Sequence, residues 1–484
     1  MFEIRLTDRL DDDQTRVVPI GPGGVIGAAS EDPAFEDLAA FVASLTDPAR
    51  AGTINALPRP LRRPARILLA GVGDGDEAGW RAAGAAAVRA VPDEQPFQVA
   101  LASTTKDGDE TTAASVRGLA EGLWLGGYRY RDAREERRSG EVQIVTVPET
   151  YAVSLTQAQA GSRATWLARD LTNTPSSIKN PDWFAEEVVG SAAGRSGVEV
   201  AIRSGDDLAR FGGIRAVGGG SKSKPCLIEV VWSPAAARTH VVLVGKGITF
   251  DTGGISIKTR PGMKTMKDDM AGAAAVVAAT LAAADLGLEH VRITALAPMA
   301  ENAIGADAFR PGDVITHYDG STSESTNSDA EGRLVLADAL GYAVAELEPD
   351  VIVDIATLTG AQVIALGETT AALYSGSDDL AATLTAHGAA AGERMWRMPL
   401  VDDYREYLHS DIADRHSSPP KGGGPAALFL HEFLGDLADR WAHIDMAGPA
   451  WTDSTELELT RGATGWGTRT LLRYLAGLDT ASAF

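Results

Sequence analysis

The chain has little of three things that would place it in a special class. It has one cysteine, Cys226, which excludes an internal disulfide and with it a disulfide-stapled secreted fold. Lys and Arg number 44 against 66 Asp and Glu, and the net charge of -22 opposes binding to phosphate backbones and anionic lipid. No uninterrupted apolar run approaches the roughly 18 residues of a membrane span. We therefore expect neither nucleic acid nor membrane as a partner.

The first residues, MFEIRLTDRL, contain no apolar leader segment, so we expect a cytoplasmic location. The remaining composition is ordinary, because 44% of the residues are apolar and 23% are charged. These values are typical of a folded globular protein and argue against disorder. A length of 484 residues suggests two or three domains.

Apolar runs and helix-like stretches alternate along the chain and predict two α/β domains. Residues 1–155 form the smaller one in this interpretation, and its function is opaque from sequence; its expected strands lie at 66–73, 97–102 and 142–147. A helical stretch ending at Asn-Thr-Pro-Ser predicts a connecting helix over 156–175. Residues 176–484 would be the larger, catalytic domain.

The larger domain alternates buried strands with helices, which predicts a central mixed, mostly parallel sheet flanked by helices. The expected strands are 240–245, 291–297 and 350–356, and the expected helices are 269–287 and 331–347. In such sheets ligands bind outside the carboxyl ends of the strands. The segments that follow these strands are therefore where we expect the chemistry.

Lysine is rare in this chain, with nine residues, and four of them fall within 246–267. An amine can lose its proton and act as a ligand or catalyst, whereas a guanidinium stays charged; a chance cluster on a solvated loop is the alternative. The segment GKGITFDTGGISIK follows the strand at 240–245 and carries Lys246, Asp251 and Lys258. It is not a phosphate-binding loop, because no Ser or Thr follows Lys246.

Two further segments place carboxylates at predicted helix starts. MKDDM carries Asp268 and Asp269, and NSDAEGRL carries Asp329, Glu331 and Arg333. Each could be a cap or a dipole partner of its helix, and for either aspartate of MKDDM alone this is the better interpretation.

Convergence of Asp251, Asp269, Asp329 and Glu331 at one sheet edge favours a metal site instead. Four ionised carboxylates repel unless cations hold them together, and two divalent ions balance their charge if Lys246 is neutral and is itself a ligand. Lys258 and Arg333 remain as cations that can stabilise an oxyanion or hold an anionic base.

The nucleophiles of other hydrolases are missing from the sequence. It has no His-Glu-x-x-His or Gly-x-Ser-x-Gly motif, and Cys226 has no nucleophile context. Metal-activated water is therefore the expected nucleophile.

VGKGITFDTGGISIK and NSDAEGRL closely resemble the two motifs of the leucyl (cytosol) aminopeptidase family of dimetal exopeptidases. The second motif differs only by Ser328 in place of Thr. The resemblance covers roughly residues 165–484 and includes ARDLTNTPS, MKDDMAGAAAV, DIATLTGA and HIDMAGPAW.

The resemblance implies an aminopeptidase that attacks the peptide with a water bridging the two ions, which are Mn or Zn. It implies that Asp251 and Glu331 bridge the metals, Lys246 and Asp269 complete the tightly held site, and Asp329 completes the exchangeable one. Lys258 would polarise the scissile carbonyl, and Arg333 would hold a bicarbonate that acts as general base. The first side chain of the peptide would be bound by Met266, Thr357 and Gly360. The resemblance also implies a homohexamer.

Departures from the family pattern leave a preference for leucine open. The segment KGGGPAALFLHEFL at 421–434 is shortened relative to the usual Gly-rich stretch. Extra charges at Arg260, Lys264, Lys267 and Asp268 could change what enters the cleft or could simply be solvated, and solvation is the favoured interpretation. Two other hypotheses are a DNA-binding regulator, which the charge of -22 disfavours, and a catalytically silent scaffold, which would need neither Lys258 nor Arg333.

Overall fold

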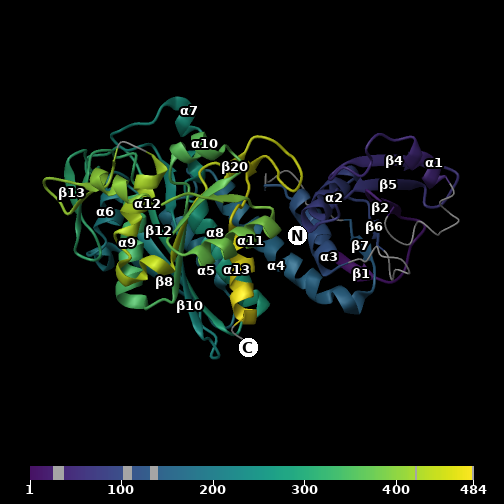
Figure 1. Ribbon diagram of the computed structural model, residues 1–484, viewed down its shortest axis with the longest axis horizontal. Coiled ribbons are helices and arrows are strands. Elements are labelled where there is room, and N and C mark those ends of the chain that lie inside the picture. The colour runs from purple at the N-terminus through teal and green to yellow at the C-terminus, as the bar shows by residue number, and fades with distance from the viewer. Residues whose placement is uncertain (26–36, 102–111, 131–139, 420–421, 482–484) are drawn as a thin grey trace. The chain divides into compact units, whose positions relative to one another are not determined.

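The computed structural model describes residues 1–25, 37–101, 112–130, 140–419 and 422–481 (Figure 1). Contacts within the chain divide it into two units. Unit 1 comprises Met1–Trp166 and Asp453–Arg461, and unit 2 comprises Leu167–Thr452 and Gly462–Phe484. The helix α4 (Pro148–Asn173) runs through the division between them. The predicted boundaries at 155 and 175 stay predictions.

Unit 1 is an α/β unit built on a seven-stranded sheet in the order β1-β7-β6-β2-β5-β4, with β3 paired to β2. Its elements are β1 (Ile4–Thr7), β2 (Thr15–Gly21), β3 (Gly24–Val25), α1 (Leu38–Ala43), β4 (Ile54–Pro58), β5 (Arg66–Gly71), α2 (Glu77–Ala90), β6 (Phe97–Ala100), α3 (Ala113–Gly126) and β7 (Val142–Val145). Alternate residues of the strands face opposite sides of the sheet. Leu68 lies in the core with α2 and α3, whereas Ile67 and Leu69 lie in a second cluster with α1. Helices therefore cover both faces.

Unit 2 contains a nine-stranded sheet in the order β17-β16-β19-β15-β10-β12-β9-β8, with β11 paired to β12. The strands are β8 (Val198–Ser204), β9 (Cys226–Trp232), β10 (Thr239–Gly245), β11 (Gly247–Asp251), β12 (Val291–Asn302), β15 (Val351–Ala356), β16 (Ala371–Ser375), β17 (Met395–Arg397) and β19 (Trp441–Asp445). The central pairs β10–β12, β10–β15 and β15–β19 are parallel, and β8, β9 and β16 join antiparallel. The predicted mixed, mostly parallel sheet is confirmed.

The helices of unit 2 are α5 (Pro181–Ala192), α6 (Gly212–Gly218), α7 (Arg260–Met263), α8 (Ala271–Leu286), α9 (Gly332–Tyr342), α10 (Gly360–Leu366), α11 (Asp378–Ala391), α12 (Gly423–His431) and α13 (Thr468–Ala481). The 3-10 helices are η3 (Gly205–Leu208), η4 (Met266–Asp268), η6 (Asp402–Leu408) and η7 (Gly435–Arg440), and η5 (Ala343–Leu347) is a π-helix that continues α9. The strands β13 (Asp313–Thr316), β14 (Thr322–Ser325) and β18 (Arg415–His416) form a small sheet, and β20 (Trp451–Thr452) pairs with β21 (Gly462–Ala463).

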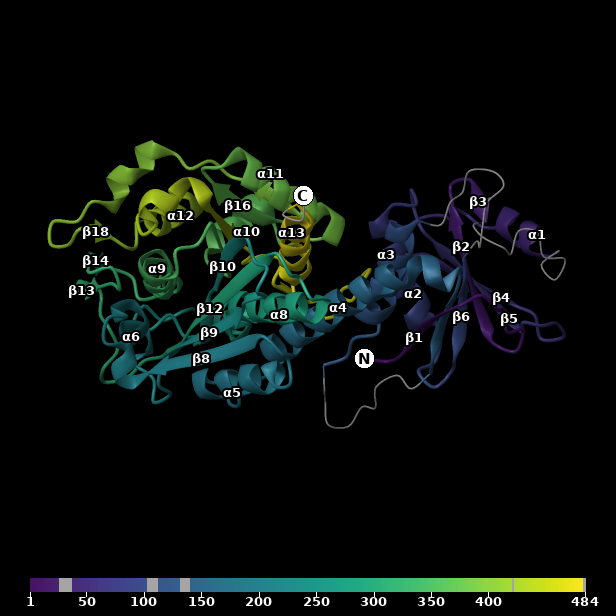
Figure 2. The same ribbon diagram turned by 90° about the horizontal axis from the view of Figure 1, so that it is seen from below.

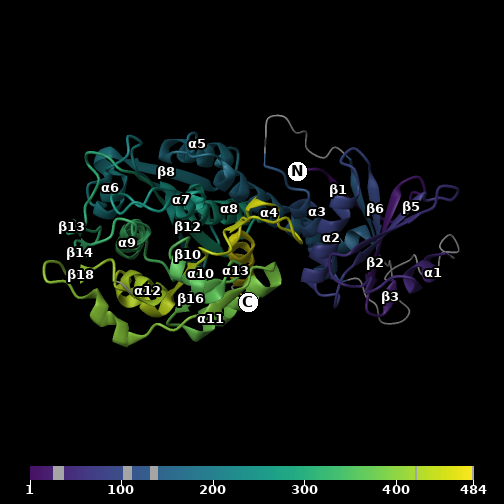
Figure 3. The ribbon, with the colours of Figure 1, turned by 90° about the horizontal axis from the view of Figure 1, so that it is seen from above.

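Helices lie on both faces of the large sheet (Figures 2 and 3). Val242 and Val244 of β10 share a core cluster with residues of α6, α9 and α12. Gly245 faces the opposite side, where a Cβ atom added to it would lie 2.3 Å from the carbonyl oxygen of Gly272 in α8. The chain therefore passes between two helical layers where β10 ends.

The helix α8 has apolar residues on all sides, and such a helix is stable only inside a protein. Its residues 271–283 are all buried, and their mostly small side chains let the helix lie close to the sheet. The segment Arg260–Leu286 is long and apolar enough to cross a membrane, but 78% of its most apolar window is buried within the protein. These properties are those of a core helix in a globular unit.

Candidate active site

Lys246 begins the site, directly after β10. Its side chain is buried and extends along the first turn of α9. A Cβ atom added to Gly332 would lie 2.4 Å from Lys246 Cε, so only glycine at position 332 leaves room for the lysine.

The amine of Lys246 lies among three acceptors. Nζ donates to Asp269 Oδ1 at 2.7 Å and to the carbonyl oxygen of Thr357 at 3.0 Å, and it lies 2.9 Å from Glu331 Oε1. Burial acts to lower the pKa of this amine, but the carboxylates of Asp269 and Glu331 outweigh burial and raise it. In the metal-free protein Lys246 is therefore an ammonium group, and it must lose a proton to coordinate a cation.

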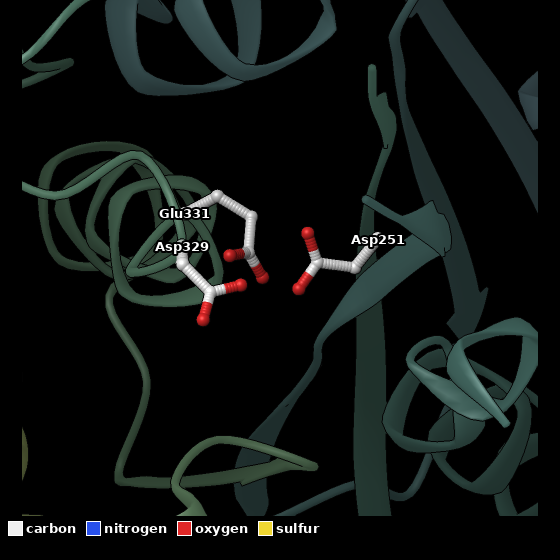
Figure 4. Close-up of side chains that lie close together, drawn as sticks. All are labelled: Asp251, Asp329 and Glu331. Atoms are coloured by element: carbon white, nitrogen blue, oxygen red, sulfur yellow. The ribbon is translucent and has the colours of Figure 1, made fainter. Parts of the chain in front are cut away.

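Three carboxylates meet in front of Lys246. Asp251, Asp329 and Glu331 each offer one oxygen, and these oxygens lie within 4.8 Å of one another. Figure 4 shows Asp329 and Glu331, from the segment just before α9, facing Asp251 at the end of β11. Asp269 is joined to this group through Lys246. The structure thus brings together all five residues predicted as metal ligands.

Lys258 lies across two of these carboxylates. Its Nζ is 2.8 Å from Asp251 Oδ2 and 2.5 Å from Asp329 Oδ1. Burial alone would lower the pKa of Lys258, but Asp251 and Glu331 raise it. Without a metal, the cationic lysine itself holds the acidic residues together.

The carboxylates are crowded and incompletely paired. Burial, with the charge of Glu331 adding to it, raises the pKa of Asp251 to about 6, and burial raises the pKa of Asp269. Within the described part of the chain, Asp269 Oδ2 and Glu331 Oε2 are buried and accept no hydrogen bond. Buried oxygens that lack donors in an acidic cluster fit divalent cations, for which carboxylates are suitable ligands.

Arg333 is the second residue of α9, two residues after Glu331, and is also buried. One of its terminal nitrogens donates to the carbonyl oxygen of Ser417 at 2.8 Å, and its Nε is without a hydrogen-bond partner among the described residues. Burial lowers the pKa of this guanidinium to about 10, so it remains a cation at neutral pH. A buried cation with a spare donor can bind a small anion.

The three residues predicted to bind substrate lie on two turns. Thr357 follows β15 and contacts one of the predicted metal ligands directly, because its Oγ1 donates to Asp269 Oδ1 at 2.8 Å. Gly360 opens α10 three residues later and is exposed. Met266 begins the 3-10 turn η4 that precedes Asp269, and it is half-buried.

Sequence reasoning missed Asn302, which supports the cluster from the end of β12. Its Nδ2 donates to Asp251 Oδ1 at 2.7 Å and to the carbonyl oxygen of Ser328 at 3.0 Å. The strand was expected to end at residue 297, but it continues to Asn302. The continuation of apolar residues through Pro298, Met299 and Ala300 is the signal that could have revealed it.

The hydroxyl of Ser328 joins two loops of the site through two hydrogen bonds. The backbone N–H of Ser256 donates to Ser328 Oγ at 2.7 Å, and Ser328 Oγ donates to the carbonyl oxygen of Gly253 at 2.7 Å. The hydroxyl ties the loop after Asp251 to the loop before Asp329. Serine supplies the same hydroxyl as the threonine that the family motif usually has here.

Asp445, at the end of β19, was also missed. Its Oδ1 accepts a bond from the backbone N–H of Leu358 at 3.1 Å, and its Oδ2 accepts one from Thr359 Oγ1 at 2.7 Å. It therefore holds the turn that carries Thr357 and Gly360. Its position in HIDMAGPAW, one of the segments that resemble the family, could have suggested a role.

Two of the four extra charges were wrongly interpreted as solvated. Arg260 and Lys264 are exposed as expected. Asp268 is buried, however, and Lys267 Nζ donates to the carbonyl oxygen of Asn173 at 2.7 Å. The predicted change at 421–434 lies partly outside the described residues, which resume at Gly422 and enter α12.

This fold and this carboxylate cluster are those of a metal-dependent hydrolase, and the comparisons identify its family. The model of the cytosol aminopeptidase family, catalytic domain, matches residues 166–472, and the model of that family's N-terminal domain matches residues 37–137. The chain belongs to the cytosol aminopeptidase family. It is accordingly a metallopeptidase that acts as an aminopeptidase.

Relatives and solved structures agree with this assignment. The chain is 40% identical over 462 residues to a probable cytosol aminopeptidase of Chlorobaculum tepidum, covering 89% of this chain and 90% of the relative. It is 41% identical over 477 residues to one of Leifsonia xyli subsp. xyli, covering 93% and 94%.

Among solved structures, the bottromycin maturation enzyme BotP in complex with Mn matches with a TM-score of 0.85 and 38% identity, covering 97% of this chain and 100% of that one. The cytosol aminopeptidase of Coxiella burnetii matches with a TM-score of 0.83 and 31% identity, covering 98% and 99%. These matches give no support to a DNA-binding regulator or a silent scaffold.

Proposed function

We propose that this chain removes N-terminal amino acids from peptides with a centre of two divalent ions held by Lys246, Asp251, Asp269, Asp329 and Glu331. The observation that carries the proposal is the meeting of three carboxylates within 4.8 Å beside a buried lysine. Buried carboxylate oxygens without donors, described above, supply the places that cations would take.

Burial supports different roles for the ligands. The side chains of Lys246 and Asp269 are each 3% exposed, whereas that of Asp329 is 33% exposed. An ion beside Lys246 and Asp269 would be enclosed and held tightly, and one beside Asp329 would be open to exchange. Asp251 and Glu331, each with an oxygen within 4.8 Å of one from Asp329, would be shared by the two ions and are the proposed bridging ligands.

Two bound divalent ions would lower the pKa of a shared water and polarise the scissile carbonyl group. Once the carboxylates of Asp251 and Asp329 are neutralised, the Lys258 ammonium is free to donate to the carbonyl oxygen as negative charge develops on it. Arg333 would hold a bicarbonate beside the cluster, and this anion would accept the proton of the attacking water.

The outer, more exposed side of the cluster is where the substrate's free amine would bind. A blocked N-terminus lacks that amine, so only unblocked peptides would be cleaved. Met266, Thr357 and Gly360 would line the pocket for the first side chain. The hydrogen bond from Thr357 Oγ1 to Asp269 supports this placement, because it holds Thr357 beside one of the proposed metal ligands.

Mn and Zn are the metals we propose, and the Mn complex of BotP, which is 38% identical to this chain, supports the first of them. Mixed lysine and carboxylate ligands are compatible with both. We also propose a cytoplasmic location and a homohexamer, as the resemblance implies. The names of the relatives, cytosol aminopeptidases, support the location.

Hydrolysis of aminoacyl-p-nitroanilides tests this function. The protein is dialysed against a chelator, Mn or Zn is added back, and Leu, Met, Ala, Arg and Glu substrates are compared with N-acetyl-Leu-p-nitroanilide. We expect cleavage of unblocked substrates only, and only after metal is restored. Cleavage of the acetylated substrate, or full activity in chelator, would contradict the proposal.

A further inference from the structure

Lys179 is a lysine with no exposed surface that lies outside the acidic cluster. Its Nζ donates to the carbonyl oxygen of Thr172 at 2.9 Å, to that of Lys267 at 2.6 Å and to Met270 Sδ at 3.0 Å. Lysine is almost never fully buried without strong compensation. Burial lowers the pKa of this amine to about 7. Because burying this amine costs free energy, we looked for what its three contacts hold in place.

Two of the residues that Lys179 contacts lie on either side of the proposed metal ligand Asp269 in the sequence. Lys267 lies in the 3-10 turn η4, and Met270 immediately precedes α8. Asp268 and Asp269 are the two residues between them. The amine thus contacts both ends of the four-residue segment that presents Asp269, and it anchors that segment to Thr172 in the last turn of α4.

Neighbouring contacts make the same connection. Lys267 Nζ donates to the carbonyl oxygen of Asn173, so a second lysine joins this segment to the end of α4. The backbone N–H of Ile248 donates to the carbonyl oxygen of Asp269 at 3.2 Å, from the strand that leads to Asp251. Together these bonds fix the segment from both sides.

We propose that Lys179 is a positioning residue for the metal centre. By binding both ends of residues 267–270, it holds the Asp269 carboxylate against Lys246 and Thr357. This inference rests on the proposed metal-dependent function. Asp269 Oδ1 accepts bonds from Lys246 Nζ and Thr357 Oγ1, which leaves Oδ2 for a cation. A ligand that is already in place does not have to be ordered when the metal binds.

A purely structural lysine would behave differently. Lys179→Met removes the desolvation cost of the lysine, but it leaves the carbonyl oxygens of Thr172 and Lys267 without this donor and the buried Asp268 without this nearby cation, so a loss of stability is expected. Metal affinity, compared with that of an equally destabilised variant, is therefore the readout that separates the two roles. If Lys179 serves only the core, Lys179→Met keeps its metal affinity. If it positions Asp269, the affinity falls even when the fold is intact.

The test compares three variants of the full-length protein after metal removal. Lys179→Met removes the clamp. Lys264→Met makes the same chemical change at an exposed lysine of the same loop. Leu281→Ala weakens the core from within α8, away from the clamp, and serves as the destabilised control. The readouts are Mn titration, amide hydrogen exchange of residues 266–270, and kcat and KM at saturating Mn.

For Lys179→Met we expect Mn affinity to fall about 10- to 100-fold, the range typical of residues that orient a ligand. We expect faster exchange at residues 267–270, and a kcat that recovers when Mn is saturating. Lys264→Met and Leu281→Ala should keep wild-type affinity. If Lys179→Met does not fold, Lys179→Gln, which is polar but too short to reach all three acceptors, takes its place.

Wild-type Mn affinity in the Lys179 variant would overturn the inference and leave the proposed function intact. An equal loss of affinity in Leu281→Ala would also overturn it, because the effect would then follow stability alone. A wild-type protein that binds no Mn or Zn would instead overturn the metal centre itself, and the inference with it.

Discussion

Two sets of buried charges, one in each unit, differ in how completely their members are paired. In unit 1, Arg81 of α2 and Glu121 of α3 are both buried and form an ion pair, with 2.8 Å between Arg81 Nε and Glu121 Oε2. In unit 2, four carboxylates share two lysines, and two buried oxygens, Asp269 Oδ2 and Glu331 Oε2, have no donor among the described residues.

Complete pairing is typical of buried charges with a structural role, and incomplete pairing is typical of buried charges at a functional site. A buried ion pair with each charge matched holds two helices in register, and an apolar pair could replace it at little cost. Crowded acids with raised pKa values work against stability and persist where a ligand relieves them. The pKa values of Asp251 and Asp269 in unit 2 are both raised, as expected for carboxylates at a ligand-binding site.

Removing one bridging carboxylate is expected to have the largest effect. Glu331→Gln should lose metal and lower kcat/KM by about four orders of magnitude, the size seen when an essential catalytic group is removed. Glu346→Gln, the same change at a part-exposed residue after α9, is the matched control. Metal content by elemental analysis and kcat/KM on Leu-p-nitroanilide check both, and unchanged metal content in Glu331→Gln would refute its role as a ligand.

Lys258 separates catalysis from metal binding within unit 2. Lys258→Ala should keep both ions and lower kcat by about 100- to 1,000-fold, because the donor to the developing oxyanion is lost. Lys264→Ala removes an exposed lysine nearby and should leave kcat unchanged. Turnover close to wild type in Lys258→Ala would exclude it from the oxyanion role.

Lys246 tests whether a neutral amine is a ligand. Lys246→Arg should fold but lose the tightly held ion, because a guanidinium stays charged and Gly332 leaves no room for a bulkier group. Elemental analysis after gel filtration would then find about half of the wild-type metal. Full metal content would show that Lys246 is not a ligand.

Metal affinity should rise with pH. The pKa of Asp251 is raised to about 6, and Lys246 must release a proton on binding, so protons compete with the metal at low pH. Titrations at about pH 5 and about pH 7 should differ by about tenfold per pH unit for each proton displaced. A pH-independent affinity would contradict this.

The stability of the metal-free protein should depend on pH in the opposite direction to the metal affinity. Because the folded state raises the pKa of Asp251 above its ordinary value near 4, it binds more protons there than the unfolded chain does. This contribution to the free energy of unfolding therefore falls as the pH rises from about 4 to about 6. Thermal unfolding with and without Mn would separate the two trends.

In unit 1 we expect an effect on stability without one on turnover. Arg81→Met removes the cation that is paired with the buried Glu121 and should cost about 3–5 kcal/mol of unfolding free energy, and Arg81→Met with Glu121→Leu should recover most of it. Neither should change kcat of the folded protein. A large fall in kcat at a temperature where the variant is folded would break the distinction between the two units.

Sequence reasoning brought Asp251, Asp329 and Glu331 together because each was expected to follow a strand of one sheet, whose carboxyl ends meet at one edge. In the structure Asp251 ends β11 of the large sheet, whereas Asp329 and Glu331 follow β14 of the small sheet, so the proximity was expected correctly but for a reason that holds only in part. Asn302 was missed because strand length is poorly determined by an apolar pattern. The burial of Asp268 was missed because a charged residue at a helix start usually faces solvent, whereas α8 begins inside the protein.

Lys179 could not be predicted at all. Its partners Thr172 and Lys267 are 7 and 88 residues away in the chain, and only the packing of α4 against the turn η4 brings them together. Contacts of this kind carry no periodic pattern. The sequence thus points to the proposed ligands more readily than to the residue proposed to hold one of them in place.

Anomalous diffraction from a crystal soaked in Mn tests the metal centre most directly. We predict two peaks, one enclosed by Lys246, Asp269, Asp251 and Glu331 and one bounded by Asp329, Asp251 and Glu331. Peaks elsewhere in the chain, with none at these carboxylates at saturating Mn, would contradict the proposed site.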